Sequence, residues 1–383
     1  MQILYNERYR GWIIQSLAIV TVLLVIGAVA NNVSNNLAAN GIATGFGFLS
    51  ETAGYEVTMS LIEYSASDTH WDAYLVGLLN TLVVSILGII TATLMGLFVA
   101  LGRLSSNWLL SRLCYAYLEY FRNVPIIIHL IIAYGILLSL PPLKRAWNFF
   151  DMIVLSNRGL TIPAPQFGAD FYYVLGALLL GFVASEYTGR YSKRKFDETG
   201  RLMPYLILKR MGLLILPAMV VYCSVDAPMT WSVPVLKGFN LQGGINFSPE
   251  FGALWLATTI YFGAHISEVI RSGILAVPKG QLDASLALGL RPMRAMFLII
   301  LPQAMRIIVP PMANYYVNII KNSTLGVAIG YADLMSTTGG TSLNITGQAI
   351  ECLIMVMATF SVFNLITAIF MNWYNAKVTL VER

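Results

Sequence analysis

The chain has 383 residues, of which 57% are apolar and only 11% are charged, with a formal net charge of +5. An average soluble domain has about 25% charged residues, so the composition excludes a water-soluble globular protein and indicates a membrane location. The basic balance does not indicate a nucleic-acid partner, because the lysines and arginines are scattered over short segments and do not gather on one face.

Apolar windows near 20 residues, the length that crosses about 30 Å of hydrocarbon, predict eight transmembrane helices. The eight windows cover residues 12–31, 73–101, 113–140, 171–189, 206–225, 251–270, 297–320 and 350–374. The predicted fold class is therefore all-α, a polytopic transmembrane helical bundle of about eight spans.

The distribution of lysine and arginine predicts the orientation of these spans, because both residues are retained on the cytoplasmic side of short loops. With both termini in the cytoplasm, 19 of the 24 cations fall in or next to cytoplasmic segments. The five that remain outside are Lys144, Arg145, Arg158, Lys237 and Lys321. This orientation places residues 268–303 in the cytoplasm.

The first span has an alternative interpretation. Arg8 and Arg10 precede an apolar stretch that ends in Ala28-Val29-Ala30, the small-residue pattern of a signal-peptide cleavage site. The uncharged run from Gly11 to Ala30 is longer than a usual signal core, which favours a retained span. Beyond it, residues 32–70 are expected to form the first external loop.

Residues 268–303 predict a compact helical hairpin between two spans. Pro278 suits the first turn of a short helix, Asp283 is placed to favour the helix dipole, and Gly289 suits a left-handed C-terminal stop. Leu282 and Leu286, at i and i+4, would share one face. A small apolar-faced helix is therefore expected to protrude from the membrane, where a groove on another subunit can grip it. The alternative is an ordinary cytoplasmic turn.

The hairpin also carries a motif. Asp283-Ala284-Ser285, three residues, Gly289, nine residues and then Ile299-x-Leu301-Pro302 match the order and spacing of the E-A-A, G, I-x-L-P signature of ABC importer permeases. The chain resembles these membrane subunits. It departs from the usual E-A-A motif at two positions, where it has Asp283 in place of Glu and Ser285 in place of the second Ala. The resemblance implies a type I ABC importer permease core. It also implies an ATPase-coupling loop that contains Pro278, Gly280, Gln281, Leu282, Asp283, Ala284, Ser285, Leu286 and Gly289.

Further segments resemble one branch, the permeases of polar amino-acid importers of the histidine/glutamine type. They are VGLLNTLVVS (76–85), LGRLSSN (101–107), EYFRNVP (119–125) and PPMANYYVNIIKNSTL (310–325). The enlarged layout is similar to the permeases of general L-amino-acid and glutamate/glutamine/aspartate/asparagine importers. This implies inner-membrane transport of L-amino acids, polar, acidic or of broad range. The implied partners are ABC ATPase subunits, a second, related permease and a periplasmic amino-acid-binding protein.

The same resemblance divides the chain into four parts. Residues 1–70 are an N-terminal span with its external loop, and residues 71–143 are the first part of the core. Residues 144–249 are an insert with two predicted spans. Residues 250–383 complete the core and contain the coupling loop, residues 271–296.

Polar residues inside apolar windows are candidates for the substrate path, because a charge at bilayer depth is either paired or functional. On the third span Glu119, Arg122, Ile126 and His129 fall on one helical stripe, which would offer both charge signs to an amino acid. The sixth span contributes His265 and Glu268, and the seventh contributes Asn314, Asn318 and Lys321, followed by Ser323. Local pairing of Glu119 with Arg122, or of Glu268 with Arg271, is the alternative, and membrane asparagines also bond across helices.

The absence of nucleotide-binding, catalytic and metal-binding motifs narrows the range of functions that the sequence predicts. The chain has no G-x-x-x-x-G-K-[S/T] phosphate loop, so ATP is expected to be used by a partner subunit, and the chain itself is expected to bind no cofactor. It has no H-E-x-x-H, no G-x-S-x-G and no Cys/His cluster, so neither a metal site nor an enzyme is predicted. The rival from another class is a self-sufficient secondary carrier, which would need an intramembrane acid for ion coupling.

Overall fold

The structure is a computed structural model that describes residues 7–39, 44–168, 170–200, 203–225 and 229–378. Contacts divide the chain into two units, Met1–Gly135 with Glu250–Arg383 and Ile136–Pro249, which are described separately. Among the described residues, seven helices are long and apolar enough to cross a membrane, and one bent pair of helices gives an eighth candidate. The fold is mostly helical, as predicted. The predicted cytoplasmic termini lie outside the described residues.

The first helix, α1, spans Glu7–Ala39, so it contains the predicted first span and continues through Ala28-Val29-Ala30. Its 33 residues would extend about 50 Å at 1.5 Å per residue. The apolar candidate span within it is Gly11–Val33, so the end of the helix, which falls in the predicted external loop, lies beyond the span. A short 3-10 turn, η2, covers Gly47–Ser50 before the next helix.

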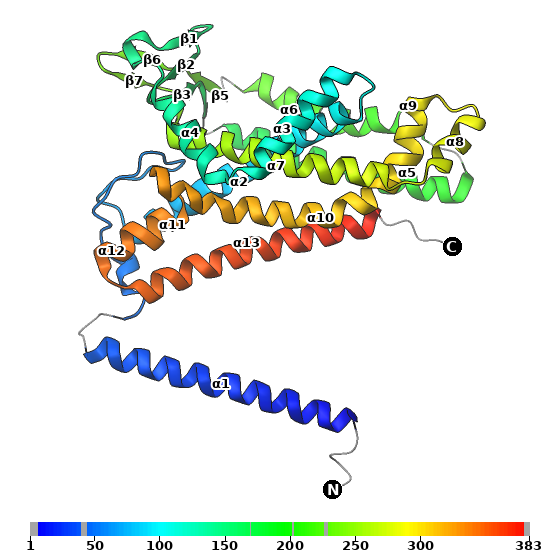
Figure 1. Cartoon of the computed structure of the whole chain (residues 1–383). Coiled ribbons are helices and arrows are strands. Elements are labelled where there is room, and N and C mark those ends of the chain that lie inside the picture. Colours follow the sequence, from blue (N-terminus) through cyan, green and yellow to red (C-terminus); the bar gives the residue numbers. More distant parts are fainter. Residues whose placement is uncertain (1–6, 40–43, 169, 201–202, 226–228, 379–383) are drawn as a thin grey trace. The chain divides into compact units, whose positions relative to one another are not determined.

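Four long helices form the centre of the larger unit: α2 (His70–Leu104), α7 (Pro249–Leu275), α10 (Leu301–Asn322) and α13 (Ala349–Val378). The start of α2 is fixed locally by a capping box, because the Thr69 side chain accepts from the amide of Asp72 while the Asp72 carboxylate accepts from the amide of Thr69. Helices α10 and α13 lie side by side (Figure 1).

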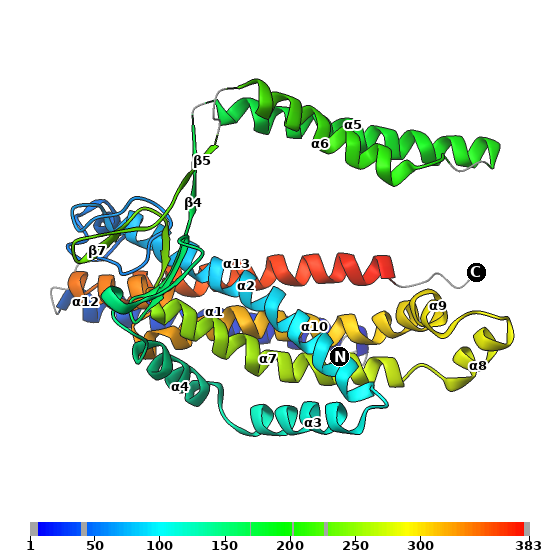
Figure 2. The ribbon, with the colours of Figure 1, turned by 90° about the horizontal axis from the view of Figure 1, so that it is seen from above.

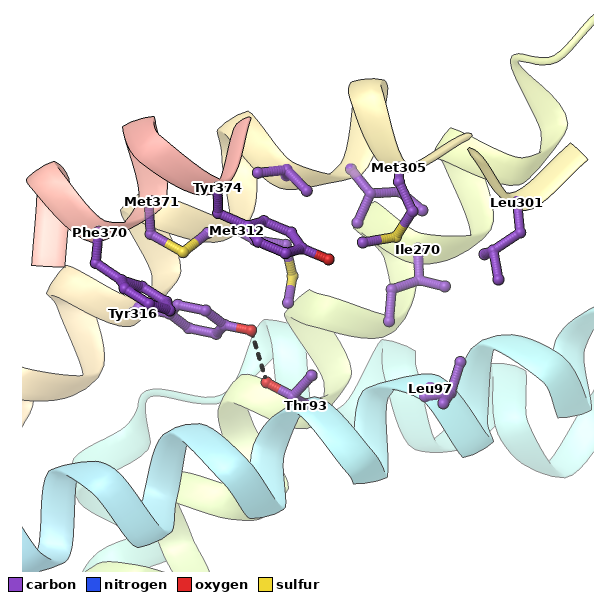
Figure 3. A pocket seen from close by; sticks show the side chains of 12 residues that line it. Thr93, Leu97, Ile270, Leu301, Met305, Met312, Tyr316, Phe370, Met371 and Tyr374 are labelled. Carbon is purple, nitrogen blue, oxygen red and sulfur yellow. Dashed lines mark hydrogen bonds between the residues drawn. The ribbon is translucent and has the colours of Figure 1, made fainter. Parts of the chain in front are cut away.

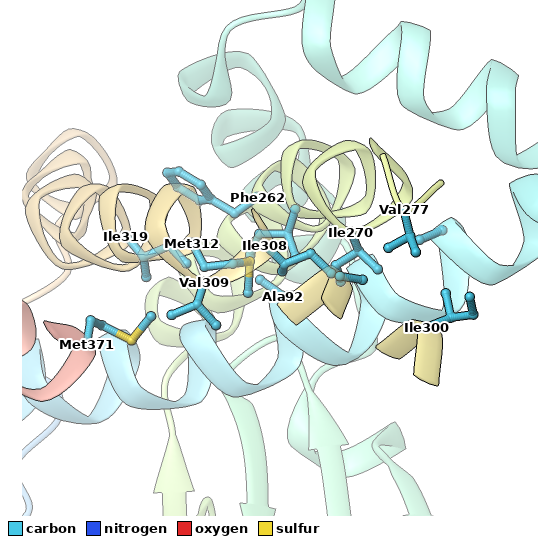
Figure 4. Packing of buried hydrophobic residues seen from close by; sticks show 13 residues of the cluster. Ala92, Phe262, Ile270, Val277, Ile300, Ile308, Val309, Met312, Ile319 and Met371 are labelled. Carbon is cyan, nitrogen blue, oxygen red and sulfur yellow. The ribbon is translucent and has the colours of Figure 1, made fainter. Parts of the chain in front are cut away.

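Buried aliphatic side chains from these helices form the core of this unit (Figure 4). Small residues let the helices approach closely. A Cβ built on Gly96 of α2 would lie 2.6 Å from Ile266 Cγ2 of α7, and one on Gly273 of α7 would lie 2.3 Å from Ile308 Cγ1 of α10. Membrane helices associate by such packing, because lipid tails are as apolar as the side chains themselves.

The third predicted span, residues 113–140, is not one straight helix. Helix α3 (Trp108–Asn123) and helix α4 (Ile126–Leu138) meet at an angle of 106°. Val124 is extended (φ −107°, ψ 129°), the conformation that a following proline imposes, and Pro125 has no N–H to continue the helix. The prediction that Glu119, Arg122, Ile126 and His129 share one helical stripe is therefore wrong.

Between α10 and α13 the chain folds back in short turns: η5 (Ser323–Ile329), α11 (Leu334–Ser336), the π-helical η6 (Thr337–Ser342) and α12 (Leu343–Thr346). This segment packs against the first turns of α2. Asn80 Nδ2 donates to the carbonyl oxygens of Met59 and Ala332 (2.8 and 2.9 Å), and the Tyr331 hydroxyl donates to the Asn80 carbonyl (2.9 Å). A Cβ on Gly77 would lie 2.1 Å from Thr337 Oγ1, so α2 and this segment are in direct contact.

The smaller unit contains the two predicted spans as helices, α5 (Phe171–Thr199) and α6 (Leu206–Ser224), which lie side by side (Figure 2). Gly181 permits this contact, because a Cβ there would lie 2.5 Å from the Leu213 carbonyl oxygen. Arg210 forms an ion pair with Glu186 across the two helices. A charge in the fifth predicted span is thus paired.

The smaller unit also contains strands, which the search for apolar windows did not predict. The eight strands follow a short 3-10 turn, η3 (Leu143–Arg145), and are β1 (Trp147–Phe149), β2 (Ile153–Ser156), β3 (Gly159–Ile162), β4 (Ala164–Phe167), β5 (Met229–Ser232), β6 (Val235–Lys237), β7 (Asn240–Gln242) and β8 (Ile245–Phe247). They form a four-stranded antiparallel sheet, β1-β2-β3-β8, and the two pairs β4-β5 and β6-β7. At three or four residues each, the strands are too short for a periodicity search.

Candidate functional site

The predicted hairpin is present, with a short helix, α8 (Lys279–Ala287), between α7 and the turn that follows. Gly289 has φ +80°, which confirms the predicted left-handed stop. The amide of Gly289 donates to the Leu286 carbonyl (2.9 Å), and that of Leu290 donates to the Ser285 carbonyl (3.2 Å). The last carbonyl groups of α8 are thus partly satisfied by the turn itself.

Three details of the hairpin differ from prediction. Pro278 is the N-cap (ψ 133°) and not part of the first turn, since the helix begins one residue later. Asp283 lies in the second turn, beyond the reach of the N-terminal dipole. Leu282 is half-buried, whereas Leu286 is 41% exposed, so the two leucines do not bury one common apolar face.

The inner side of α8 is held against the rest of the larger unit. Leu282 packs against the core cluster of α7 and α10, and Ser285 is 1% exposed, with its hydroxyl donating to the Leu282 carbonyl (2.6 Å). Gln303 Nε2 of α10 donates to Gln281 Oε1 (3.3 Å). The helix α9 (Pro292–Ala295) and the π-helical turn η4 (Met296–Ile300) complete the connection to α10.

The outer side of the same hairpin is open. Gly280, Asp283, Ala284, Leu286 and Gly289 are exposed, and Leu288 is 82% exposed. Two leucines and small side chains thus form a convex surface without a partner inside the described part of the chain. Such a surface can seat in a groove on another subunit.

Glu268 joins two helices near the hairpin. Its Oε1 accepts from Arg271 Nη2 (2.8 Å), and its Oε2 pairs with Arg103 of α2. The local Glu268–Arg271 pair proposed as the alternative is therefore present, and Arg103 adds a link between α2 and α7. Arg103 also lies over the Tyr115 ring of α3, 5.4 Å from its centroid.

His129 and His265 lie in one series of rings. His129 of α4 is 7% exposed and lies 4.7 Å from the Phe121 ring and 6.3 Å from the Tyr261 ring, measured between centroids. Tyr261 lies 4.8 Å from His265, which stacks on Tyr315 of α10 at 5.7 Å. His265 Nε2 is buried without a hydrogen-bond partner. The break at Pro125 thus brings two distant histidines together through Tyr261.

Glu119 and Arg122 are exposed on α3 and do not pair with each other in the described part of the chain. The side chain of Asn123 instead bonds the Glu119 carbonyl oxygen (2.7 Å). Both the common stripe with His129 and the local ion pair expected for these two residues are therefore wrong.

Asn314, Asn318 and Lys321 form an exposed stripe on α10. The spacing places all three on one helical face, as predicted. Ser323, the last candidate, differs from them: it is 2% exposed, and its hydroxyl donates to the Ile320 carbonyl (2.8 Å). An exposed stripe of two amides and an ammonium on a membrane span must face water or another protein surface, since lipid does not satisfy such groups.

A separate apolar cavity of about 430 Å³ lies between α2, α7, α10 and α13 (Figure 3). Met305, Met312 and Phe370 are among its lining residues, and its polar contact is between the Tyr316 hydroxyl and Thr93 Oγ1 (3.0 Å). None of the candidate substrate-path residues lines this cavity. Its lining therefore suits apolar groups, not a zwitterion.

The contacts of three residues of this unit were not predicted from the sequence. Arg103 was counted as a cytoplasmic cation and was given no partner, although it pairs with Glu268. Asn80 and Asp333 are both 0% exposed and were not singled out. The signal was available for Asn80, which is an amide inside the second apolar window. Asp333 falls between two apolar windows, in a segment where the sequence gives no reason to single out an acidic residue.

The helices and the hairpin define a polytopic membrane protein with a protruding loop between two spans. Residues 92–380 match the family described as binding-protein-dependent transport system inner membrane component, and the chain belongs to this family. It is a membrane-spanning permease component.

Three relatives match nearly the whole chain. It is 41% identical over 379 residues to the putative amino-acid ABC transporter permease protein YhdX of Escherichia coli (strain K12), covering 99% of this chain and 96% of the relative. It is 41% identical to the general L-amino acid transport system permease protein AapQ of Rhizobium johnstonii, covering 99% and 95%. It is 35% identical to the glutamate/glutamine/aspartate/asparagine transport system permease protein BztB of Rhodobacter capsulatus, covering 100% and 96%.

A solved structure is also similar. It is a crystal structure of an amino acid ABC transporter with histidines, at 20% identity and a TM-score of 0.46, covering 80% of this chain and 95% of that chain.

Proposed function

We propose that the chain is the permease subunit of an ATP-binding-cassette importer that carries L-amino acids, polar, acidic or of broad range, across the bacterial inner membrane. The observation that carries this proposal is the full-length similarity to permeases whose names specify amino-acid transport. A second, related permease, ABC ATPase subunits and a periplasmic amino-acid-binding protein complete the complex. Both termini and the coupling loop lie in the cytoplasm.

The coupling loop transmits ATPase movement to the spans by rigid contact. Its α8 follows α7 directly, and Gln281 is bonded to Gln303 of α10, while Leu286 and Leu288 are exposed to a partner. A displacement of α8 therefore acts on both helices, and Glu268 passes it to α2 through Arg103. Such helix shifts support alternating access.

The exposed stripe on α10 is the part of the substrate path that this chain contributes. Lys321 binds the substrate carboxylate, and Asn314 and Asn318 satisfy its remaining polar groups, on a surface that faces the second permease or water. The His129–Tyr261–His265 series packs behind α10 through Tyr315 and positions this face.

The experiment is reconstitution of the complete importer in proteoliposomes. Amino-acid uptake is expected only with the ATPase, ATP and the binding protein present. Uptake by this chain alone under an ion gradient would instead establish the secondary carrier.

Labelling tests the orientation separately, in a variant without Cys114, Cys223 and Cys352. A membrane-impermeant maleimide is expected to label Asn148→Cys, on an exposed strand residue, in intact cells. It is expected to label Ala284→Cys, on the exposed side of α8, only after permeabilisation. External labelling of residue 284 would exclude an ATPase contact at the coupling loop.

A further inference from the structure

Two side-chain oxygens without partners lie in one buried region, where α2 meets the 331–342 segment. Asp333 and Asn80 are each 0% exposed, and neither Asp333 Oδ2 nor Asn80 Oδ1 has a hydrogen-bond partner among the described residues. Buried polar oxygens are nearly always paired, so each such atom requires an explanation. Two such oxygens in the same region require one common explanation.

Hydrogen bonds bring these residues together and fix the role of each oxygen. Asn80 Nδ2 donates both of its protons, one to the Met59 carbonyl and one to the Ala332 carbonyl, so the side-chain Oδ1 can only accept. Ala332 directly precedes Asp333 in the chain. Asp333 Oδ1 accepts the Ser336 amide (2.8 Å) as the N-cap of α11. On α2, Thr81 Oγ1 accepts the amide of Leu334 (3.0 Å).

No cation compensates the Asp333 carboxylate. Within the described ranges it takes part in no ion pair. Burial raises the pKa of Asp333 and hydrogen bonds from backbone amides lower it, and no charged side chain contributes to the shift. Tyr331, beside it, is the titratable group whose pKa is raised by burial and by the Asp333 charge. The other titratable groups on the surrounding elements are His70, Asp72 and Tyr74 at the start of α2, and Glu51, Tyr55, Glu56, Glu63, Tyr64 and Asp68 on the 51–69 loop. His70 and Tyr55 both bond Ser342 at 2.9 Å. Two acceptors without a donor are satisfied together when one proton is added, since a neutral carboxyl donates through its O–H.

We infer that Asp333 is a buried proton-binding site, whose neutral carboxyl donates to Asn80 Oδ1 directly or through one water. The proton stabilises the packing of the 331–342 segment against α2. Burial supports this assignment, since it raises the Asp333 pKa to about 7, while the backbone amides lower it by less. The site therefore exchanges its proton near neutral pH.

The sign of the pH effect follows from linkage. A carboxyl whose pKa is higher in the folded than in the unfolded chain stabilises the fold while it is protonated, and this contribution is lost as pH rises toward the folded pKa of about 7. The thermal unfolding midpoint of the full chain in detergent is expected to fall by about 5 °C between pH 5.5 and 8.5.

Asp333→Asn tests the inference, because the amide carries a donor at the same place and mimics the neutral acid. The variant is expected to have lost this pH dependence and to unfold at or above the wild-type midpoint at pH 8.5. A variant that retains the wild-type slope, or that is destabilised only at pH 8.5, would overturn the inference. Infrared spectroscopy of the wild-type chain keeps the test independent of the variant's folding: a protonated-carboxyl band that titrates near pH 7 is expected, and its absence at pH 5.5 excludes the site.

Sodium is the competing occupant. If sodium chloride, compared with choline chloride, raised the wild-type midpoint at pH 8.5 but not that of Asp333→Asn, the site would take a metal cation and the proton assignment would be wrong. These measurements use proton binding and stability, not transport, so their failure leaves the importer proposal unaffected.

Discussion

Arg103 of α2 and Glu268 of α7 form an ion pair across 165 residues of sequence, and Glu268 also accepts a 2.8 Å hydrogen bond from Arg271 on its own helix. The Arg103 side chain is 12% exposed and that of Glu268 is 30% exposed, so the pair is only partly screened by solvent. It connects α2, which precedes the bent pair α3 and α4, with α7, which leads into the proposed coupling loop.

Replacing Arg103 by Ala is expected to destabilise the chain more than replacing Arg271 by Ala, because only Arg103 joins two helices. A hydrogen bond to a charged group contributes about 1.5–3 kcal/mol, so a loss of about 2 kcal/mol is expected for Arg103→Ala. Denaturant unfolding in detergent measures it. A double-mutant cycle with Glu268→Ala isolates the pair, and a coupling energy near zero would contradict the link.

Gly289→Ala is expected to weaken ATPase binding, because φ +80° is unfavourable for any residue with a Cβ. The substitution meets no neighbour within 4 Å, so its cost is backbone strain of about 1–2 kcal/mol at the end of α8. Gly176→Ala is the matched control: it also has open space, lies inside α5 and outside the hairpin, and should stabilise its helix slightly. Co-purification with the ATPase distinguishes the two variants, and equal retention by both would count against coupling at α8.

Gly77→Ala is expected to destabilise the chain by about 1–3 kcal/mol through overpacking. The new Cβ would lie 2.1 Å from Thr337 Oγ1 and 3.0 Å from two backbone atoms, the Asp333 carbonyl oxygen and Leu334 Cα, so a side-chain rotation does not relieve it. Gly135→Ala, with nothing within 4 Å, serves as the control. Thermal unfolding of both variants is the measurement, and a Gly77→Ala protein as stable as the control would show that the 331–342 segment is not held against α2.

Lys321→Gln is expected to raise the half-saturating concentration for ATP-driven uptake about 10–100-fold, because a charge-assisted bond of about 1.5–3 kcal/mol to the substrate carboxylate is lost. The isolated chain should keep its stability, since Lys321 is exposed. Lys377→Gln removes the same charge from the end of α13, where the ammonium lies 3.8 Å from the Trp373 ring, and should leave uptake unchanged. If both variants transport alike, Lys321 is not a substrate contact.

The sequence by itself determined the features that depend on neighbouring residues. Apolar windows predicted the spans, because the hydrocarbon thickness fixes their length, and the Gly289 stop followed from a local backbone preference. Pro125 has no N–H to continue a helix, yet this local rule gives no angle, and one span was predicted where the chain turns by 106°.

Only the tertiary structure decided which distant groups meet. Arg103, the partner of Glu268, lies 165 residues away in the sequence, and the Ala332 carbonyl that accepts from Asn80 lies 252 residues away. His129 and His265 meet through Tyr261 only because the break at Pro125 redirects α4. Composition and periodicity describe how one segment partitions between lipid and water. The pairing of buried charges and amides depends instead on how helices pack, and that is a property of the whole chain.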